Sequence, residues 1–344
     1  MKKSINFNEM PQKILIVKPS ALGDVIHALP FLSALKNRFP DAAIHWVIAK
    51  GLEGLLSNHP MIEKLWIINK GAWKNPSNIS KTIRELKSLF SNLAIQNYDL
   101  VIDLQGLLRS AVITHFSKAK LSVGFSDARE TAPFFYDIKI KGGKDIHAVD
   151  RYLKIAQYLD CNINAVNFAM PKFDPLPPIM KTLPEKYIVI IPSAMAQPKR
   201  WQPERFGQLA SILPYPSIII GSANDMPISE IVLKFSNGNA RSLCGETTLI
   251  DLMAVIKNAV FCITNDTGPM HIAAALNIPI AAIFGPTNPI RTGPYGENNI
   301  IIRKVLPCSP CYKRKKCSNR ICLDSLSADD VKEAVYCSPK FGLL

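Results

Sequence analysis

No stretch of this sequence is apolar enough to cross a bilayer, because no apolar run approaches the roughly 18 residues that a spanning helix needs. The opening residues, MKKSINFNEM, contain two lysines with no apolar segment behind them, so they do not resemble a secretory signal peptide. Low-complexity tracts and close internal repeats are also missing. These absences lead us to expect a globular protein of the cytoplasm.

Common nucleotide and metal motifs are missing as well. The loop at residues 18–24 is neither the G-x-G-x-x-G of dinucleotide-binding folds nor the G-x-x-x-x-G-K-[ST] of P-loops. No His, Cys and carboxylate cluster has the spacing of a catalytic metal site, and no D-x-D pair is available for Mg²⁺. We therefore expect a reaction that uses neither a metal nor a cofactor.

Acidic residues are too few to balance the basic ones, and the formal net charge is +14. The basic residues gather partly in clusters: Lys70, Lys74, Lys81, Arg84 and Lys87, then Lys139, Lys141 and Lys144, then residues 313–316. Such an excess favours anionic partners, although solubility alone would also account for it. No aromatic residues interleave with the clusters as they do on base-stacking surfaces, so nucleic acid is not the expected partner.

Four of the eight cysteines form the pattern C-x2-C-x5-C-x4-C, at Cys308, Cys311, Cys317 and Cys322. The CxxC opening is typical of zinc sites, but the remaining spacing is tight for a standard ribbon or finger. We favour a plain reduced loop over a structural metal site or a redox-sensitive clip, because disulfides are disfavoured in the cytoplasm. The scattered cysteines, Cys161, Cys244, Cys262 and Cys337, are interpreted as small apolar residues.

Strand-like apolar runs alternate with segments of helical period, and a proline-rich connector at residues 171–184 interrupts them. Before the connector, strands are predicted at 14–17, 44–48, 64–68, 100–103 and 121–124, and helices at 24–39, 77–93, 107–116 and 148–159. After it, strands are predicted at 187–191, 217–221, 260–264 and 279–284, and helices at 203–213, 226–235, 249–258, 269–276 and 328–335.

This alternation, over 344 residues, predicts an α/β protein with two Rossmann-like, doubly wound domains. We place them at residues 1–174 and 175–344, facing a cleft, and allow that the last helix packs back on the first domain.

Two loops, at residues 18–24 and 265–271, each follow a predicted buried strand and precede a helix, where open α/β sheets bind ligands. In the first loop, Asp24 opens a helix, whose N–H groups and dipole hold the carboxylate as an anion. Such an anion can accept a proton from a sugar hydroxyl, and Gly23 permits a close backbone approach. The simpler interpretation of Asp24 is a helix cap.

In the second loop, Gly268 is expected to cap a helix whose first residue is Pro269, leaving N–H groups for a phosphate. Thr267 adds a hydroxyl donor, and Asp266 can orient a sugar or its own loop. His271 lies one turn into the helix, where it either donates to a phosphate oxygen or is an interior histidine.

Three further segments follow strands. Lys199 can neutralise a departing diphosphate or be an ordinary exposed base, Asp225 can bind a ribose diol, and residues 285–287 can line the same cleft. A base and a phosphate seat together indicate group transfer from an activated, phosphate-bearing donor.

These motifs resemble glycosyltransferase family 9, the lipopolysaccharide heptosyltransferases, from Lys13 to about Tyr295. The most specific segments are ILIVKPSALGDVIHALP (14–30), VIDLQGLLRSA (101–111), HAVDRYL (147–153), KRWQPERF (199–206), TNDTGPMHIAAAL (264–276) and FGPTNP (284–289). The first half is most like heptosyltransferase I, whereas the cysteine-rich loop is more like type II.

The resemblance implies the GT-B architecture and an inverting transfer of heptose from ADP-L-glycero-β-D-manno-heptose to the Kdo region of lipid A–inner core. It implies Asp24 as the catalytic base and Lys199 as the lysine that stabilises the departing ADP phosphates. The implied donor-binding residues are Ala194, Met195, Lys199, Asp225, Thr247, Asp266, Thr267, Gly268 and His271. Ala194 and Met195 stand where heptosyltransferase I has two threonines.

The acceptor would then bind the first domain through Gly23, Arg109 and Arg129, since arginine can hold a carboxylate by two hydrogen bonds. The basic surface would hold the enzyme peripherally on the anionic, cytoplasmic face of the inner membrane. Two alternatives remain: heptosyltransferase II or another family 9 transferase with a different nucleotide-sugar donor, and a non-catalytic basic binding protein. The presence of both Asp24 and Lys199 speaks against the second.

Overall fold

The computed structural model describes residues 9–71, 73, 79–143, 145–172, 175–312, 317 and 319–342. The chain divides into two compact units, Met1–Lys172 and Phe173–Leu344, whereas the sequence placed the division after residue 174. None of the helices in the described residues is long and apolar enough to traverse a bilayer.

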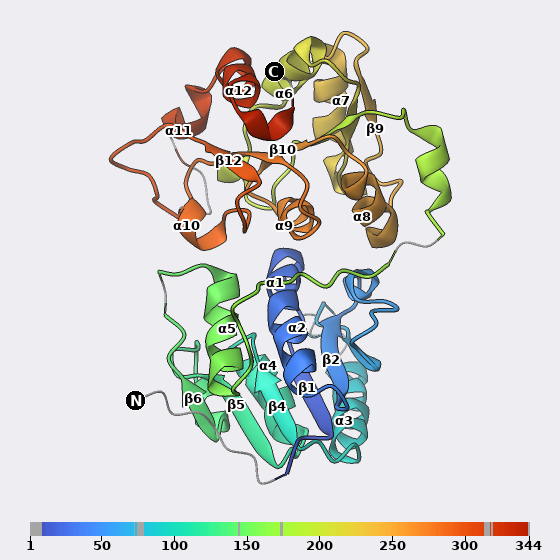
Figure 1. Ribbon diagram of the computed structural model, residues 1–344, viewed down its shortest axis with the longest axis vertical. Helices are drawn as coiled ribbons and strands as arrows, with labels where there is room; N and C mark the ends of the chain where they lie inside the picture. Colours follow the sequence, from blue (N-terminus) through green and yellow to red (C-terminus); the bar gives the residue numbers. More distant parts are fainter. Residues whose placement is uncertain are drawn as a thin grey trace. The chain divides into compact units, whose positions relative to one another are not determined.

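The first unit is built on a six-stranded parallel sheet (Figure 1). Its strands are β1 (Lys13–Val17), β2 (Ala43–Ala49), β3 (Lys64–Ile68), β4 (Leu100–Asp103), β5 (Leu121–Phe125) and β6 (Ile138–Ile140). Their order is β3-β2-β1-β4-β5-β6, the Rossmann order, so the direction of progression reverses between β1 and β4. Loops that leave these two neighbours at their carboxyl ends diverge and open a crevice.

Helices cover both faces of this sheet. They are α1 (Leu22–His27), α2 (Leu29–Arg38), α3 (Ile79–Ala94), α4 (Leu108–Phe116) and α5 (Ala148–Tyr158), with short helices η1 (Glu53–Leu55) and η4 (Ala132–Phe135). On one face Leu15 and Val17 of β1 pack with Leu93 of α3 and Ile113 of α4, while α2 packs beside α5. Because both faces are covered, β1 reads as the continuous apolar run of a buried parallel strand.

The second unit repeats this topology in the order β12-β11-β10-β7-β8-β9, with the reversal between β7 and β10. Its strands are β7 (Ile188–Ile191), β8 (Ser217–Ile219), β9 (Ala240–Ser242), β10 (Cys262–Asn265), β11 (Ile280–Ile283) and β12 (Asn299–Ile302). Its helices are α6 (Pro203–Ile212), α7 (Met226–Phe235), α8 (Leu249–Lys257), α9 (Gly268–Ala275), α10 (Pro289–Thr292), α11 (Ile321–Asp324) and α12 (Ala328–Tyr336). Short helices are η5 (Pro178–Thr182), η6 (Gln197–Lys199), η7 (Ala223–Asp225) and η8 (Pro339–Phe341). The predicted fold class, α/β with two doubly wound Rossmann-like sheets, is confirmed.

One sequence expectation needs correction. The helix expected at 24–39 is two helices that meet at Ala28, because Pro30 lacks the N–H that a continuous helix would use. Within the second unit, the last helix packs against α6, where Val331 and Val335 join the core around Phe206.

Helix α6 approaches α7 closely at Gly207, so a larger side chain at this position should lower the stability of the second unit. A Cβ at Gly207 would lie 2.5 Å from the carbonyl oxygen of Val232 and 2.6 Å from Cβ of Phe235. Alanine favours a helix over glycine by about 1 kcal/mol, but such an overlap costs about 1–3 kcal/mol or more. We expect Gly207→Ala to lower the melting temperature by several degrees.

The matched control is Gly71→Ala, whose Cβ would meet nothing closer than Asn69 Oδ1, at 3.7 Å. This exposed change should stay within about 0.5 kcal/mol of the parent chain. Equal melting of all three proteins would contradict the close approach of α6 and α7.

Candidate functional site

The site residues expected from the sequence lie beyond the carboxyl ends of strands in their own units. Asp24 follows β1, Arg109 follows β4 and Arg129 follows β5, whereas Lys199 follows β7 and Asp266 follows β10. Asp24 and Arg109 therefore lie at the switch point between β1 and β4, and Lys199 and Asp266 lie at the one between β7 and β10. Arg129 lies one strand further along the first sheet.

Asp24 is fixed by its own turn. Its Oδ2 accepts a hydrogen bond from the backbone N–H of Ala21, at 3.0 Å. Ala21 is the N-cap of α1 and Asp24 is its third residue, so Asp24 satisfies the N-cap backbone but is not itself the cap. The same turn is tied to the loop after β4, because the backbone N–H of Ser20 donates to Oε1 of Gln105, at 3.3 Å. Asp24 itself is half-buried, so part of its carboxylate remains accessible.

Lys18, for which the sequence suggested no role, is the buried cation of this site. Its side chain is 3% exposed, donates to the carbonyl of Leu104 at 3.4 Å, and lies 5.1 Å from the ring centre of Tyr152. Burial opposes its charge, but Tyr152 and the neighbouring Asp24 and Asp103 outweigh burial, and the pKa of Lys18 lies above its ordinary value. Its only sequence signal is a lysine directly after an apolar strand.

Asp103 organises the loop that follows β4. It is fully buried, and it accepts hydrogen bonds from the backbone of Gln105 and Gly106, at 2.8 and 3.0 Å, and from the hydroxyl of Tyr136, at 2.7 Å. Burial raises the pKa of Asp103, and these donors oppose that rise. Because Gln105 holds the Ser20 backbone, Asp103 indirectly positions the turn that carries Asp24.

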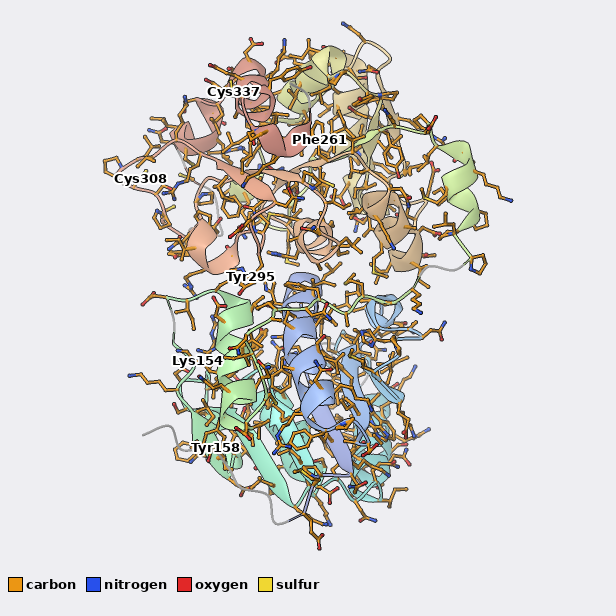
Figure 2. All side chains as sticks on the ribbon, in the orientation of Figure 1. Lys154, Tyr158, Phe261, Tyr295, Cys308 and Cys337 are labelled. Atoms are coloured by element: carbon orange, nitrogen blue, oxygen red, sulfur yellow. The ribbon has the colours of Figure 1, made fainter. Side chains whose placement is uncertain are left out.

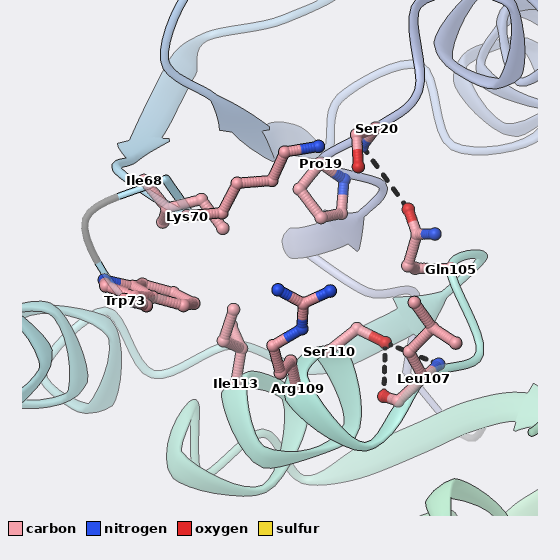
Figure 3. A pocket seen from close by; sticks show the side chains of 10 residues that line it. All are labelled: Pro19, Ser20, Ile68, Lys70, Trp73, Gln105, Leu107, Arg109, Ser110 and Ile113. Carbon is pink, nitrogen blue, oxygen red and sulfur yellow. Dashed lines mark hydrogen bonds between the residues drawn. The ribbon is translucent and has the colours of Figure 1, made fainter. Parts of the chain in front are cut away.

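A pocket opens beside this turn, where β1, β3 and β4 end (Figure 3). Lys70 after β3 and Arg109 on α4 extend into it from different elements, with Trp73 on the same wall as Lys70. Its floor is partly polar, with Ser20 and Gln105. Two cations around one small pocket suit a carboxylate or phosphate group.

Arg129 and Gly23 take other positions in the first unit. The Arg129 backbone N–H donates to the carbonyl of Gly106, at 3.0 Å, while its side chain is exposed and does not line the pocket. Gly23 is buried within the first turn of α1.

In the second unit, three loops meet at one carboxylate. Asp266 Oδ2 accepts hydrogen bonds from Lys199 Nζ and from Thr287 Oγ1, both at 2.6 Å. Asp266 is 5% exposed, while the side chain of Lys199 is 26% exposed. The loops after β7, β10 and β11 are thereby joined, and the lysine reaches the surface with its position already fixed.

Asn265, the last residue of β10, supports this contact and was not singled out from the sequence. Its Oδ1 accepts from the backbone N–H of Trp201, at 3.0 Å, and its Nδ2 donates to the carbonyl of Pro192, at 2.7 Å. It therefore holds both ends of the loop that carries Lys199. The sequence signal for Asn265 is an asparagine at the end of an apolar strand. In the structure this residue is fully buried, so its side chain needs hydrogen-bond partners.

The start of α9 differs by one residue from the expectation. The helix begins at Gly268, so Thr267 is the N-cap and Pro269 the second residue, whereas the sequence placed the cap at Gly268. The Thr267 side chain makes no capping hydrogen bond, so the backbone N–H groups of this turn keep their positive potential. His271 lies in the same turn and is 7% exposed.

The other expected donor residues are spread along the same sheet edge. Ala194 is buried, with its carbonyl accepting from Arg200 Nε at 2.6 Å, whereas Met195 is 94% exposed. Asp225, after β8, accepts from the backbone and the hydroxyl of Ser222, at 2.8 and 2.7 Å. Thr247, after β9, is half-buried directly before the N-cap of α8.

Comparison with known proteins gives a consistent result. The model of glycosyltransferase family 9 (heptosyltransferase) matches residues 86–321. Lipopolysaccharide heptosyltransferase 1 of Pseudomonas aeruginosa is 29% identical over 88% of this chain and 86% of its own. Lipooligosaccharide heptosyltransferase 2 of Haemophilus influenzae is 28% identical over 85% of this chain and 88% of its own.

Among solved structures, Escherichia coli heptosyltransferase WaaC with ADP-2-deoxy-2-fluoro heptose superposes with a TM-score of 0.78. The two chains are 26% identical, and the match covers 94% of this chain and 98% of the other.

The hydroxyl of Thr287 makes a contact that can be tested alone. Thr287→Val leaves the buried Asp266 carboxylate with one donor fewer, which costs about 1–3 kcal/mol, so its melting temperature should fall. Thr287→Ser keeps the hydroxyl and should melt close to the parent chain. If the valine and serine variants have the same melting temperature, the Thr287–Asp266 hydrogen bond does not contribute to the stability of the fold.

Proposed function

This chain belongs to glycosyltransferase family 9, and we propose that it transfers heptose from ADP-L-glycero-β-D-manno-heptose to the Kdo region of lipid A–inner core, in lipopolysaccharide biosynthesis. It is a glycosyltransferase of two Rossmann-like units, the GT-B architecture. The observation that carries the proposal is a charged group at each switch point. Asp24 stands at one as a base, and Lys199 stands at the other as a phosphate-binding cation.

In this proposal Asp24 takes the proton of the acceptor hydroxyl while that oxygen attacks the anomeric carbon of the heptose. The bond from this carbon to the diphosphate breaks in the same step, and ADP leaves. A single displacement inverts the anomeric configuration. The Ala21 N–H, which donates to Oδ2 at 3.0 Å, holds this carboxylate in place.

The second unit binds the donor. Lys199 and the amino-terminal turn of α9 stabilise the negative charge that develops on the departing diphosphate, with Thr267, Gly268 and His271 around the phosphates. Asp225 then binds the ribose, and Thr247 lines the site of the adenine. With this positive potential supplied by the protein, the transfer itself uses no metal.

The first unit binds the acceptor. Arg109 and Lys70 hold an acidic group of the inner core in their pocket, and Gly23 and Arg129 lie along the same edge. Lys81, Arg84 and Lys87 are exposed on α3, where each contributes about 1 kcal/mol of attraction to an anionic leaflet. The enzyme thus acts as a peripheral protein on the cytoplasmic face of the inner membrane.

A second candidate is heptosyltransferase II. The heptosyltransferase 2 relative and the cysteine-rich loop both favour it. The two candidates differ in the acceptor, since type I takes an inner core with no heptose and type II takes one that already carries the first heptose.

The test is a transfer assay with purified chain, ADP-heptose and both acceptors, with other nucleotide sugars as competing donors. We expect turnover of ADP-heptose with the heptose-free acceptor, and a product of inverted anomeric configuration by NMR. Turnover only with the heptose-bearing acceptor selects type II. Absence of any transfer from ADP-heptose overturns the proposal.

Asp24→Asn tests the base. It keeps the size and a capping oxygen but cannot take up a proton, so kcat should fall by about 10²–10⁴-fold while ADP affinity stays unchanged. Calorimetric titration with ADP measures the affinity. Asp41→Asn, an exposed acidic residue elsewhere in the unit, is the control and should keep full activity. If the Asp24→Asn variant keeps full activity, Asp24 is not the catalytic base.

Arg109→Gln tests the acceptor pocket. A lost charge-assisted hydrogen bond is worth about 1.5–3 kcal/mol, so KM for the acceptor should rise at least about tenfold, with KM for ADP-heptose unchanged. Arg303→Gln, an exposed arginine of the second unit, controls for loss of surface charge. A rise in the donor KM instead would assign Arg109 to the other substrate.

A further inference from the structure

The four clustered cysteines take no part in the proposed transfer, and their arrangement has a chemistry of its own. Cys308 and Cys311 are separated as C-x2-C, and Cys317 and Cys322 as C-x4-C. Both separations lie within the range over which paired cysteines hold one zinc ion. The sequence therefore offers two ligand pairs in one short segment.

The structure fixes the first pair against the loop that follows β11. The hydroxyl of Ser309, beside Cys308, donates to the carbonyl of Gly285, at 2.6 Å. The backbone N–H of Tyr312, beside Cys311, donates to the carbonyl of Pro286, at 2.7 Å. Both residues that flank the first pair are therefore held at the same turn.

The second pair approaches the same turn from α11. A Cβ on Gly285 would lie 3.1 Å from Sγ of Cys322 and 2.8 Å from Cγ of Leu323. Only glycine leaves room for this thiol. Gly285 is thus contacted by the segment that carries the first pair and by a cysteine of the second pair.

All eight cysteines are in the thiol form. As the loop stands, no three His, Cys, Asp or Glu side chains in the described part of the chain are positioned to hold a metal ion. A bound cation would have to draw the two pairs together.

We propose that Cys308, Cys311, Cys317 and Cys322 bind one thiolate-preferring divalent cation, Zn²⁺ or Fe²⁺, in a tetrahedral structural site that closes over Gly285. Four sulfur–metal bonds form and four S–H protons go to solvent, with no change of oxidation state. The resulting site carries two net negative charges. The sequence of this segment is basic, with lysine or arginine at 313–316 and Arg320, and such a composition suits a negatively charged site.

This site is separate from the transfer chemistry and does not depend on the proposed function. The turn at Gly285 connects this site to the proposed donor-binding loops. Thr287, two residues after Gly285, donates a hydrogen bond to Asp266, so a metal that fixes the turn at Gly285 also restrains the Thr287 hydroxyl.

The first experiment measures metal content by mass spectrometry in full-length chain purified with reductant and without added metal. We expect about one zinc or iron ion per chain. Cys308→Ser with Cys311→Ser should lose it. Cys337→Ser, an exposed cysteine that lies apart from Cys308 in Figure 2, should keep it. A double variant that retains the metal, or a parent chain that contains none and takes up none, overturns the proposal.

The second experiment avoids the variants, in case they fail to fold. The parent chain, stripped with a chelator, is titrated with Co²⁺. We expect thiolate-to-cobalt charge-transfer bands and the intense visible bands of tetrahedral cobalt, saturating at about one equivalent, with four of the eight thiols protected from alkylation. A weak octahedral spectrum, no protection, or a mass short by the hydrogens of disulfides would refute the site.

Discussion

A carboxylate that is only 5% exposed needs partners, and the geometry of the second unit follows from how Asp266 obtains them. Lys199 reaches it from the loop after β7, and Thr287 from the loop after β11. Lys199, the cation that we propose binds the donor diphosphate, is therefore already fixed by contacts within the protein. Because Asp266 balances its charge, a diphosphate bound as proposed would share this lysine with Asp266. The uncapped first turn of α9 supplies the additional positive potential.

The first unit has the same strand order with the opposite placement of charge. There the half-exposed group is the carboxylate of Asp24, and the buried charged groups are the cation of Lys18 and the carboxylate of Asp103. One topology, used twice, thus places a carboxylate near the surface at one switch point and a lysine cation at the other.

Features that repeat along the chain were predictable from the sequence, whereas contacts between loops were not. Central strands such as β1 are buried on both faces and stand out as apolar runs. The short edge strands β6 and β9 are largely half-buried and have no such run, and β12 has a run of only three isoleucines. Asp24 and Lys199 were predicted as site candidates from their positions after strands, and the structure has them after β1 and β7. The Lys199–Asp266 ion pair was not predicted, because it depends on β7 lying next to β10, and the burial of Lys18 likewise depends on packing.

In the function that we propose, the choice of sugar has to depend on groups other than the side chains of residues 194 and 195. Neither Ala194 nor Met195 has a side-chain hydrogen-bonding group of the kind that threonine offers. The carbonyl of Ala194 is also engaged, by Arg200. Met195, at 94% exposed, offers an adaptable apolar surface that fits many shapes and selects weakly among hydroxyl patterns. Discrimination by hydroxyl position then falls to groups already held in one orientation, and in the second unit Asp266, fixed by Lys199 and Thr287, meets that requirement.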